Sequence, residues 1–246
     1  MPSLDAARDR PKIGSKVLGV IVARGGSKGV PGKNLIDLCG RPALAWTIEA
    51  GLKSMAIGRL ILSTDSPEMA DIARQMGCEV PFMRPTDLAQ DDTPINKVIL
   101  HALDMCGDGF DYVLKLQASS PLRLPEDIDE TAAKCFATGA PACISVVQSS
   151  KSVFWAMRMK ADGTLDPLHG ADYQRMRRQD LPSIYIPNGA VYIAEIPWYR
   201  QVRTWVWEGT VGYEMPAERS LDIDGEFEVA LIRALLQDRM ARERRS

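Results

Sequence analysis

The feature that most constrains the fold is an unbroken apolar segment, residues 17–23, which is mostly β-branched and runs directly into a glycine-rich loop. A strand with one face in water would alternate apolar and polar residues. An unbroken apolar run therefore predicts a strand covered on both faces. Such strands build the parallel sheets of α/β proteins, so this segment predicts the first strand of a parallel sheet with helices on both sides.

The segments that follow alternate between strand and helix patterns. Strands are predicted over Arg59–Thr64, Glu79–Met83, Tyr112–Gln117 and Ala142–Val147, and helices over Ala43–Lys53, Glu68–Met76, Asn96–Met105 and Pro125–Ala137. Repeated βα units of this kind predict an α/β fold with a doubly wound, mostly parallel, Rossmann-like sheet. Ligands of such sheets bind beyond the carboxyl ends of the strands. The loops after Ala23, Thr64, Met83 and Gln117 are therefore expected to share one crevice.

The pattern changes in the second half of the chain. Extended structure is predicted over Phe154–Met159 and Ser183–Ala194, short strands over Trp205–Glu208 and Val211–Met215, and a final helix over Glu226–Ala241. We expect a disordered tail over residues 1–16 and a single domain over residues 17–246. Within it, the polar and basic stretch at about 151–182 is expected to leave the sheet as a dimerisation arm or lid.

Composition excludes several classes of protein. The 246 residues are 46% hydrophobic and 25% charged, and the formal net charge is -2, so no global field would attract nucleic acid or an anionic membrane. The five cysteines include no CxxC pair, which argues against a disulfide framework or a zinc site. The polar amino terminus and the lack of a long apolar run lead us to expect a cytoplasmic protein without membrane or nucleic-acid partners.

The loop from Arg24 to Asn34 combines glycines with the cations of Arg24, Lys28 and Lys33. Glycines allow backbone N–H groups to approach a ligand closely, and the cations supply the positive charge that a triphosphate needs. The loop is not a Walker A loop, because the spacing ahead of Gly32-Lys33 has one residue too many and Asn34 stands where a metal-binding hydroxyl belongs. A solvated basic loop is the alternative, but its place after the first buried strand favours a phosphate site.

A pair of carboxylates lies near the other end of the chain. Asp222 and Asp224 flank Ile223, and in an extended segment residues i and i+2 point to the same side. Mg2+ is commonly held by one or two carboxylates together with substrate phosphates. The alternative is that one of these residues caps the terminal helix. Asp65, at the end of another predicted strand, fits a helix cap as well.

Taken together, these motifs resemble the signature of the N-acylneuraminate cytidylyltransferases (CMP-sialic acid synthetases). The loop agrees over Val22–Gly29 with Pro31, Lys33 and Asn34. Further blocks agree in order: Ser63–Asp65, Arg84-Pro85 with Leu88-Ala89, Gln117 with Ser120–Arg123, Arg178-Gln179 with Leu181-Pro182, Pro187–Tyr192, and Asp222–Asp224. The resemblance covers about residues 17 to 240.

The resemblance implies a homodimer with the fold of nucleotide-diphospho-sugar transferases. It implies a reaction of CTP with a nine-carbon 2-keto sugar acid that gives a CMP-sugar and pyrophosphate. Matching positions imply that nucleotide contacts come from Ala23, Arg24, Gly25, Gly26, Ser27, Lys28, Lys33, Asn34 and Arg84. They imply that Gln117, Ser119, Asn188 and Tyr192 line the sugar site, that Arg178 meets the sugar carboxylate, and that Asp222 and Asp224 hold Mg2+. Arg24, Lys28, Lys33, Asp222 and Asp224 are the implied catalytic residues.

Two departures from the family pattern concern the sugar. The usual Gln-Pro-Thr-Ser-Pro-Leu-Arg reads here as Gln117-Ala118-Ser119-Ser120-Pro121-Leu122-Arg123, and the lysine expected near the sugar carboxylate has no match around Lys151 to Trp155. The acceptor therefore stays open among N-acetylneuraminic, legionaminic, pseudaminic and related nonulosonic acids. The alternatives are a ketodeoxyoctonate cytidylyltransferase, a guanylyltransferase acting on a sugar phosphate, or a nucleotide-binding module without activity.

Overall fold

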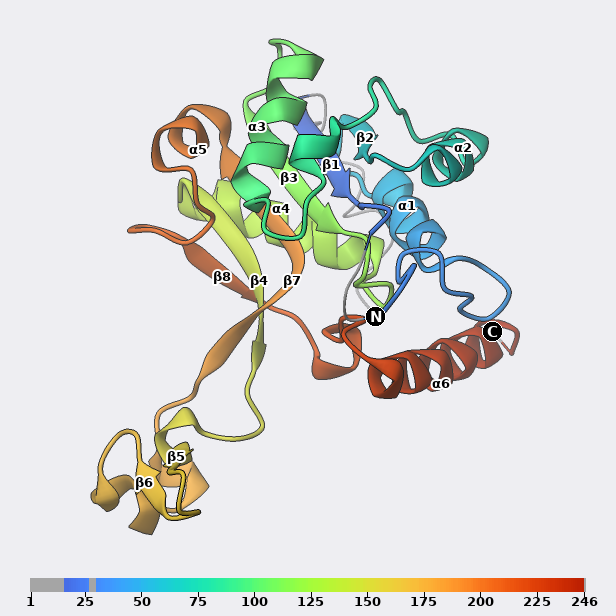
Figure 1. Cartoon of the computed structure of the whole chain (residues 1–246). Helices are drawn as coiled ribbons and strands as arrows, with labels where there is room; N and C mark the ends of the chain where they lie inside the picture. The colour runs from blue at the N-terminus through green and yellow to red at the C-terminus, as the bar shows by residue number, and fades with distance from the viewer. Residues whose placement is uncertain (1–15, 27–29, 246) are drawn as a thin grey trace.

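A computed structural model describes residues 16–26 and 30–245 (Figure 1). Its centre is a six-stranded sheet with the order β2-β1-β3-β7-β4-β8. The strands are β1 Val17–Val22, β2 Arg59–Ser63, β3 Tyr112–Gln117, β4 Ala142–Gln148, β7 Tyr185–Glu195 and β8 Val211–Glu214. β1 pairs in parallel with β2 and β3, and β4 with β8, whereas β7 runs antiparallel between β3 and β4. The sheet is therefore mixed and mostly parallel, as predicted.

The first strand is buried on both faces. Leu18 and Val20 pack into one apolar cluster, and Val17 and Ile21 into another on the opposite side of the sheet. Val22, at the end of β1, pairs with Ser63 of β2 and Gln117 of β3. Because three parallel strands end at the same level, the loops that follow them meet at one edge of the sheet.

Helices cover both faces of the sheet (Figure 1). They are α1 Ala43–Lys53, α2 Pro67–Gln75, α3 Ile95–Cys106, α4 Pro125–Thr138, α5 Ile196–Val202 and α6 Glu226–Glu243. Buried residues of α1, α2 and α4 share the cluster of Val17, whereas those of α3 and α5 share the cluster of Leu18. The last helix, α6, packs on a third cluster with Leu38 and Ala43. No helix in the described ranges is long and apolar enough to cross a membrane.

Two predicted strands are wrong. Residues 79–83 make one isolated bridge, Ile61 with Glu79, because Pro81 has no N–H to continue a ladder. The segment 205–208 is a turn in which Trp205 is buried against Tyr199, with ring centroids 4.4 Å apart, and Trp207 is exposed. The sequence pattern there reflects one buried aromatic side chain. The helix α5 was not predicted.

Residues 151–182, which we call the lobe, project from the sheet at the ends of β4 and β7 (Figure 1). The lobe contains a hairpin of β5 Met157–Met159 and β6 Leu165–Pro167. The prediction of extended structure over Phe154–Met159 is confirmed only for its second half, which is β5. Residues 153–155 form a 3-10 turn, with the Ser152 hydroxyl accepting a hydrogen bond from the Phe154 N–H. The Phe154 and Tyr173 rings stack with centroids 4.7 Å apart. The role of the lobe in dimerisation stays a prediction.

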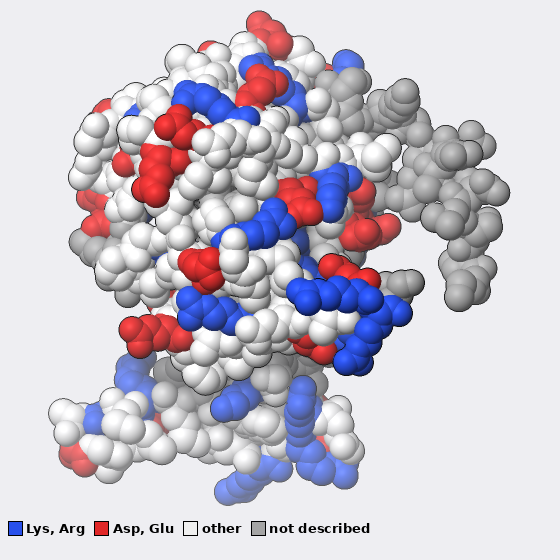
Figure 2. All heavy atoms as spheres, turned by 90° about the vertical axis from the view of Figure 1, so that its right-hand side faces the viewer, with Lys and Arg blue, Asp and Glu red and all other residues white. Residues whose placement is uncertain are grey.

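The predicted tail lies almost entirely outside the described residues. Its last residue, Lys16, is described and forms an ion pair with Asp111 at 3.0 Å. Over the face shown in Figure 2, Lys and Arg lie among Asp and Glu, and basic side chains are prominent on the lobe at the bottom. This mixed surface agrees with the small net charge of the chain.

Candidate functional site

The loop after β1 is held at both of its described ends. The Gly25 N–H donates to the Asp65 carboxylate at 2.9 Å, and the Asn34 side-chain amide donates to the Arg24 carbonyl at 3.2 Å. The expectation that Asp65 caps a helix is wrong, because the Ser66 hydroxyl caps α2. Asp65 connects the loops that follow β1 and β2 instead. The predicted site residues Ser27 and Lys28 lie outside the described residues.

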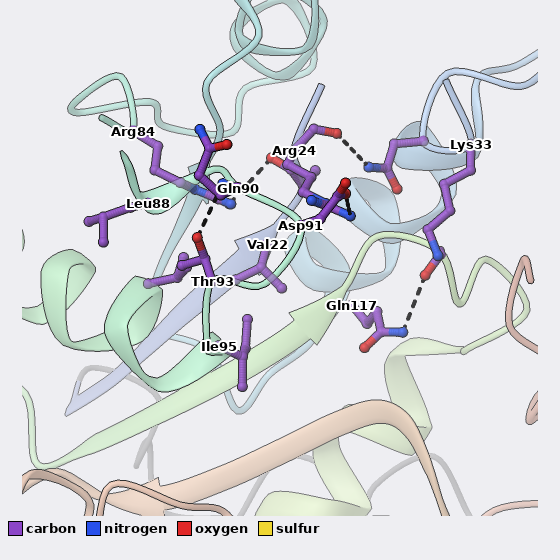
Figure 3. A pocket seen from close by; sticks show the side chains of 14 residues that line it. Val22, Arg24, Lys33, Arg84, Leu88, Gln90, Asp91, Thr93, Ile95 and Gln117 are labelled. Carbon is purple, nitrogen blue, oxygen red and sulfur yellow. Dashed lines mark hydrogen bonds and ion pairs between the residues drawn. The ribbon is translucent and has the colours of Figure 1, made fainter. Parts of the chain in front are cut away.

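A cavity of about 210 Å³ opens beyond the carboxyl ends of β1 and β3. Its lining combines residues of the loops after β1, after Met83 and after β3 with the start of α3 (Figure 3). The lining residues are Val22, Ala23, Arg24, Lys33, Asn34, Arg84, Leu88, Gln90, Asp91, Thr93, Ile95, Val98, Gln117 and Ser119. Three of the four loops predicted to share a crevice therefore do so. The loop after β2 supplies no lining residue and is connected to the loop after β1 through Asp65.

One wall of the cavity was not predicted. Arg24 forms an ion pair with Asp91 at 2.5 Å, and the two side chains point toward each other in Figure 3. Gln90 and Thr93 line the same wall. A polar loop between a strand and a helix gives little sequence signal, since such composition is typical of any surface loop.

Arg84 is buried at the base of the cavity. Its guanidinium donates to the Ser63 hydroxyl at 3.1 Å, to the Ala23 carbonyl at 3.3 Å, and to the Ser63 carbonyl. Burial lowers the pKa of Arg84 to about 10, and the Asp65 carboxylate opposes that shift. The side chain is therefore charged at neutral pH and links the ends of β1 and β2.

The predicted metal ligands Asp222 and Asp224 are not among the residues that line the cavity, but their segment is hydrogen-bonded to two residues that do, Lys33 and Gln117. Ile223 is fully buried; its N–H donates to the Ser119 carbonyl at 2.9 Å, and its carbonyl accepts from Lys33 Nζ at 3.1 Å. The Asp222 carboxylate accepts from Gln117 Nε2 at 2.6 Å. The structure thus connects the basic loop, the end of β3 and the segment before α6, which are far apart in the sequence.

The exposed carboxylate of Asp224 lies two residues beyond Asp222. Neither residue is the N-cap of α6, since Gly225 occupies that position. Two carboxylates beside a basic loop fit a hard divalent cation such as Mg2+. This ion takes oxygen ligands, and several of them usually come from substrate phosphates and water. Among the described residues, no group of three or more His, Cys, Asp or Glu side chains is placed to hold a metal by itself.

The predicted sugar-site residues fall into three places. Gln117 and Ser119 line the cavity. Asn188 and Tyr192 lie on β7 outside that lining; the Asn188 amide donates to the Ser220 hydroxyl at 2.9 Å and accepts from the Ser145 hydroxyl at 2.5 Å. Arg178 is exposed within the lobe and is not among the residues that line the cavity.

Two buried cations behind the cavity were not predicted as site residues. Arg123 donates to the Ala190 carbonyl at 2.6 Å and to the Thr47 hydroxyl at 2.8 Å. Lys115 lies on β3, two residues before Gln117. Burial lowers its pKa to about 7, with the charge of Arg123 adding to the shift and that of Asp222 opposing it. A lysine inside an apolar run is the sequence signal that could have identified it.

Comparison with known proteins agrees with this geometry. A family model described as cytidylyltransferase matches residues 18–208. The N-acylneuraminate cytidylyltransferase of Escherichia coli is 34% identical over 220 residues, covering 88% of this chain and 52% of that protein. The CMP-N,N'-diacetyllegionaminic acid synthase of Legionella pneumophila is 34% identical over 227 residues, covering 90% of this chain and 97% of that protein. The chain thus spans about half the length of the first relative and nearly all of the second.

Solved structures share the fold at low sequence identity. A CMP:2-keto-3-deoxy-manno-octonic acid synthetase complexed with CTP matches with a TM-score of 0.66 and 17% identity, over 91% of this chain and 99% of that one. A 4-diphosphocytidyl-2C-methyl-D-erythritol synthase from Anaerococcus prevotii matches with a TM-score of 0.62 and 14% identity, over 90% and 98%. These two structures show the α/β fold, and the family model and the relatives show that the chain is of the nucleotidyltransferase class. Within that class the chain belongs to the cytidylyltransferase family, among relatives named N-acylneuraminate cytidylyltransferases, as its motifs predicted.

Proposed function

We propose that the chain catalyses transfer of a cytidylyl group from CTP to a nine-carbon, nonulosonic 2-keto sugar acid, giving a CMP-sugar and pyrophosphate. The observation that carries this proposal is the bond between Lys33 Nζ and the Ile223 carbonyl. It connects a basic, glycine-rich loop suited to phosphates with a carboxylate pair suited to a divalent cation. The names of the relatives favour cytidine nucleotides and sialic-acid-like acceptors.

The loop cations of this chain would bind and orient the triphosphate. Arg24, Lys28 and Lys33 would neutralise charge that develops on the leaving pyrophosphate, and Arg24 would exchange Asp91 for a phosphate oxygen. Asn34 and Arg84 would contact the base. The anomeric hydroxyl of the sugar acid attacks the α-phosphorus, the bond from the α-phosphorus to the pyrophosphate oxygen breaks, pyrophosphate leaves, and the hydroxyl proton passes to solvent water. Positioning and charge neutralisation account for most of such catalysis.

Asp222 and Asp224 would hold Mg2+. When bound, this ion would neutralise phosphate oxygens and lower the pKa of a coordinated hydroxyl. The carboxylate of Asp222 already accepts hydrogen bonds from Gln117 and from the Ser120 hydroxyl, at 2.6 and 3.4 Å, so its orientation is fixed without a ligand. Gln117, Ser119, Asn188 and Tyr192 would line the adjoining sugar site.

The proposed reaction predicts pyrophosphate release that needs CTP, Mg2+ and a nonulosonic acid together. We expect turnover with CTP to exceed turnover with GTP or UTP by at least about a hundredfold, because a base site with fixed hydrogen-bonding groups rejects mismatched bases. The measurement is a coupled pyrophosphate assay against N-acetylneuraminic, legionaminic, pseudaminic and ketodeoxyoctonic acids. Preference for the eight-carbon acid would favour the ketodeoxyoctonate alternative. CTP binding without turnover on any acid would favour a module without activity.

We also propose that the active form is a homodimer in which Arg178 on the lobe serves the cleft of the other copy. The lobe projects from the sheet beyond β4 and β7 (Figure 1), and Arg178 within it is exposed and is not among the residues that line the cavity of its own chain. A two-fold dimer would give each cleft one lobe from the opposite subunit.

This arrangement predicts complementation between two inactive variants, Lys33→Ala and Arg178→Ala. In a mixed dimer, one cleft has both an intact loop and an intact Arg178 from the other subunit. Random exchange of subunits should therefore restore about a quarter of wild-type turnover. The measurement is activity after co-refolding an equimolar mixture, with each variant alone as the control. No recovery in a mixture shown to exchange subunits contradicts the shared site.

A further inference from the structure

Lys115 occupies an unusual place for a charged side chain. It lies in the middle of β3, where the register pairs it with Val20 of β1 and with Tyr192 of β7. Only 4% of the residue is exposed. Side chains from the same face of these strands, such as Val20 and Val113, belong to an apolar cluster. Lysine is almost never buried to this extent unless a particular interaction requires its charge.

The contacts of Lys115 lead toward the cavity. Its Nζ lies 4.1 Å from the ring centroid of Tyr192, in a cation–π contact, and 3.4 Å from Gln117 Oε1. Among the described residues, no carboxylate forms an ion pair with it. The ammonium group is therefore held between an aromatic face and the side-chain amide of a cavity-lining residue.

This contact determines which way the Gln117 amide faces. An ammonium group can only donate hydrogen bonds, and a carboxylate can only accept them. With Lys115 at Oε1 and Asp222 at Nε2, the amide has a single satisfied orientation. Gly189, at φ +76°, leaves room for it, since an added Cβ would lie 3.1 Å from Gln117 Oε1. The amide is thus held from several sides.

We propose that Lys115 is a positioning residue that acts through Gln117. Its ammonium group holds the amide oxygen, so that the amide N–H groups face Asp222 and the part of the cavity assigned to the sugar acid. The contact between Lys115 and Gln117 does not depend on the proposed function, whereas the expected effects on KM rest on it. This positioning role explains why a cation occupies an apolar strand, where leucine or methionine would pack without a desolvation cost.

Lys115→Met is expected to raise KM for the sugar acid about tenfold, the effect of losing one charge-assisted hydrogen bond, with KM for CTP unchanged. The thermal midpoint should stay equal or rise, because an apolar side chain replaces a buried charge. A lower thermal midpoint together with equal increases in KM for the sugar acid and KM for CTP would show a merely structural role for Lys115. That result would overturn the proposal. Lys134→Met, at an exposed position of α4, is the matched control.

A double-mutant cycle tests whether Lys115 acts through Gln117. If it does, Lys115→Met should have little further effect in a Gln117→Met background, because the group that it positions is already absent. If the increase in KM for the sugar acid in the double variant equals the product of the increases in the two single variants, the two residues act independently and the proposal is overturned. Both single variants and the double variant are compared in the same pyrophosphate assay.

A spectroscopic readout separates this inference from the proposed function. The side-chain ¹⁵N–¹H₂ signal of Gln117 is identified by its absence in Gln117→Met. It should shift and exchange faster with solvent in Lys115→Met but not in Lys134→Met. An unchanged signal overturns the inference even if the enzyme is active. A changed signal in a protein that turns over no sugar acid would support the positioning contact and reject the proposed function.

Discussion

Asp224→Asn is expected to lower turnover at saturating CTP and Mg2+ by roughly a thousandfold, the loss that follows when several kcal/mol of charge stabilisation are removed. Asp224 is exposed two residues beyond Asp222, so its carboxylate is available to a cation, whereas its removal takes little from the packed structure. An amide keeps the shape of the side chain and loses its charge. The measurement is pyrophosphate release over a range of Mg2+ concentrations, with Mg2+ affinity determined by calorimetry in the presence of CTP.

The matched control is Glu226→Gln, which removes a neighbouring exposed carboxylate in the first turn of α6. It should leave both turnover and Mg2+ affinity within about twofold of wild type, as for most surface substitutions. Asp222→Asn should lower turnover as well and also raise KM for the sugar acid, because Asp222 accepts the hydrogen bond of Gln117. Full turnover by Asp224→Asn at saturating Mg2+ would reject the proposed metal role.

The sequence predicted the parts of the fold that follow from local patterns. The buried strand β1, the three parallel strands that end together, and the loop that follows Ala23 all depend on apolar runs and on glycine and proline positions. The same patterns led to the family, which the matched model and the relatives confirm. The acidic pair of Asp222 and Asp224 was predicted. The hydrogen bonds that join this segment to Gln117 and Lys33 were not.

What the sequence could not predict depends on pairing between distant segments. The extended segment over residues 185–195 could have been an edge strand, and nothing local shows that β7 runs antiparallel between β3 and β4. That insertion places Tyr192 beside Lys115 and Ala190 beside Arg123. Buried cations of this kind depend on partners that only tertiary structure supplies.

Arg123 is the second position at which we expect a large effect, this time on stability. It is 2% exposed, and its guanidinium bonds the carbonyls of Ala190 on β7 and Gln117 at the end of β3, together with the Thr47 hydroxyl of α1. Burial lowers the pKa of Arg123 to about 10, so the group is still charged at neutral pH. One side chain therefore joins two strands and a helix directly behind the cavity.

Arg123→Met should lower the free energy of unfolding by about 3 kcal/mol, because it removes the side-chain donor to the Ala190 carbonyl, the bond to the Thr47 hydroxyl and one of the donors to the Gln117 carbonyl, which also accepts from the Ser120 N–H at 3.3 Å. The measurement is urea unfolding at neutral pH, with the change taken from the midpoint at constant slope. Thr47→Val removes only the hydroxyl that accepts a hydrogen bond from Arg123, and it should lower the free energy of unfolding by about 1 kcal/mol. KM for the sugar acid should rise in Arg123→Met as well, since the backbone of Gln117 loses its support.

The comparison variant is Arg200→Met, which breaks an exposed ion pair with Asp104 at 2.8 Å. Exposed ion pairs contribute little to stability, so the free energy of unfolding of Arg200→Met should stay within about 0.5 kcal/mol of the wild-type value. If Arg123→Met were as stable as Arg200→Met, water or a rearranged side chain would be satisfying the carbonyls of Ala190 and Gln117. In that case Arg123 would not be what joins β3, β7 and α1, and the orientation of the Gln117 amide would rest on its side-chain partners Lys115, Ser119 and Asp222.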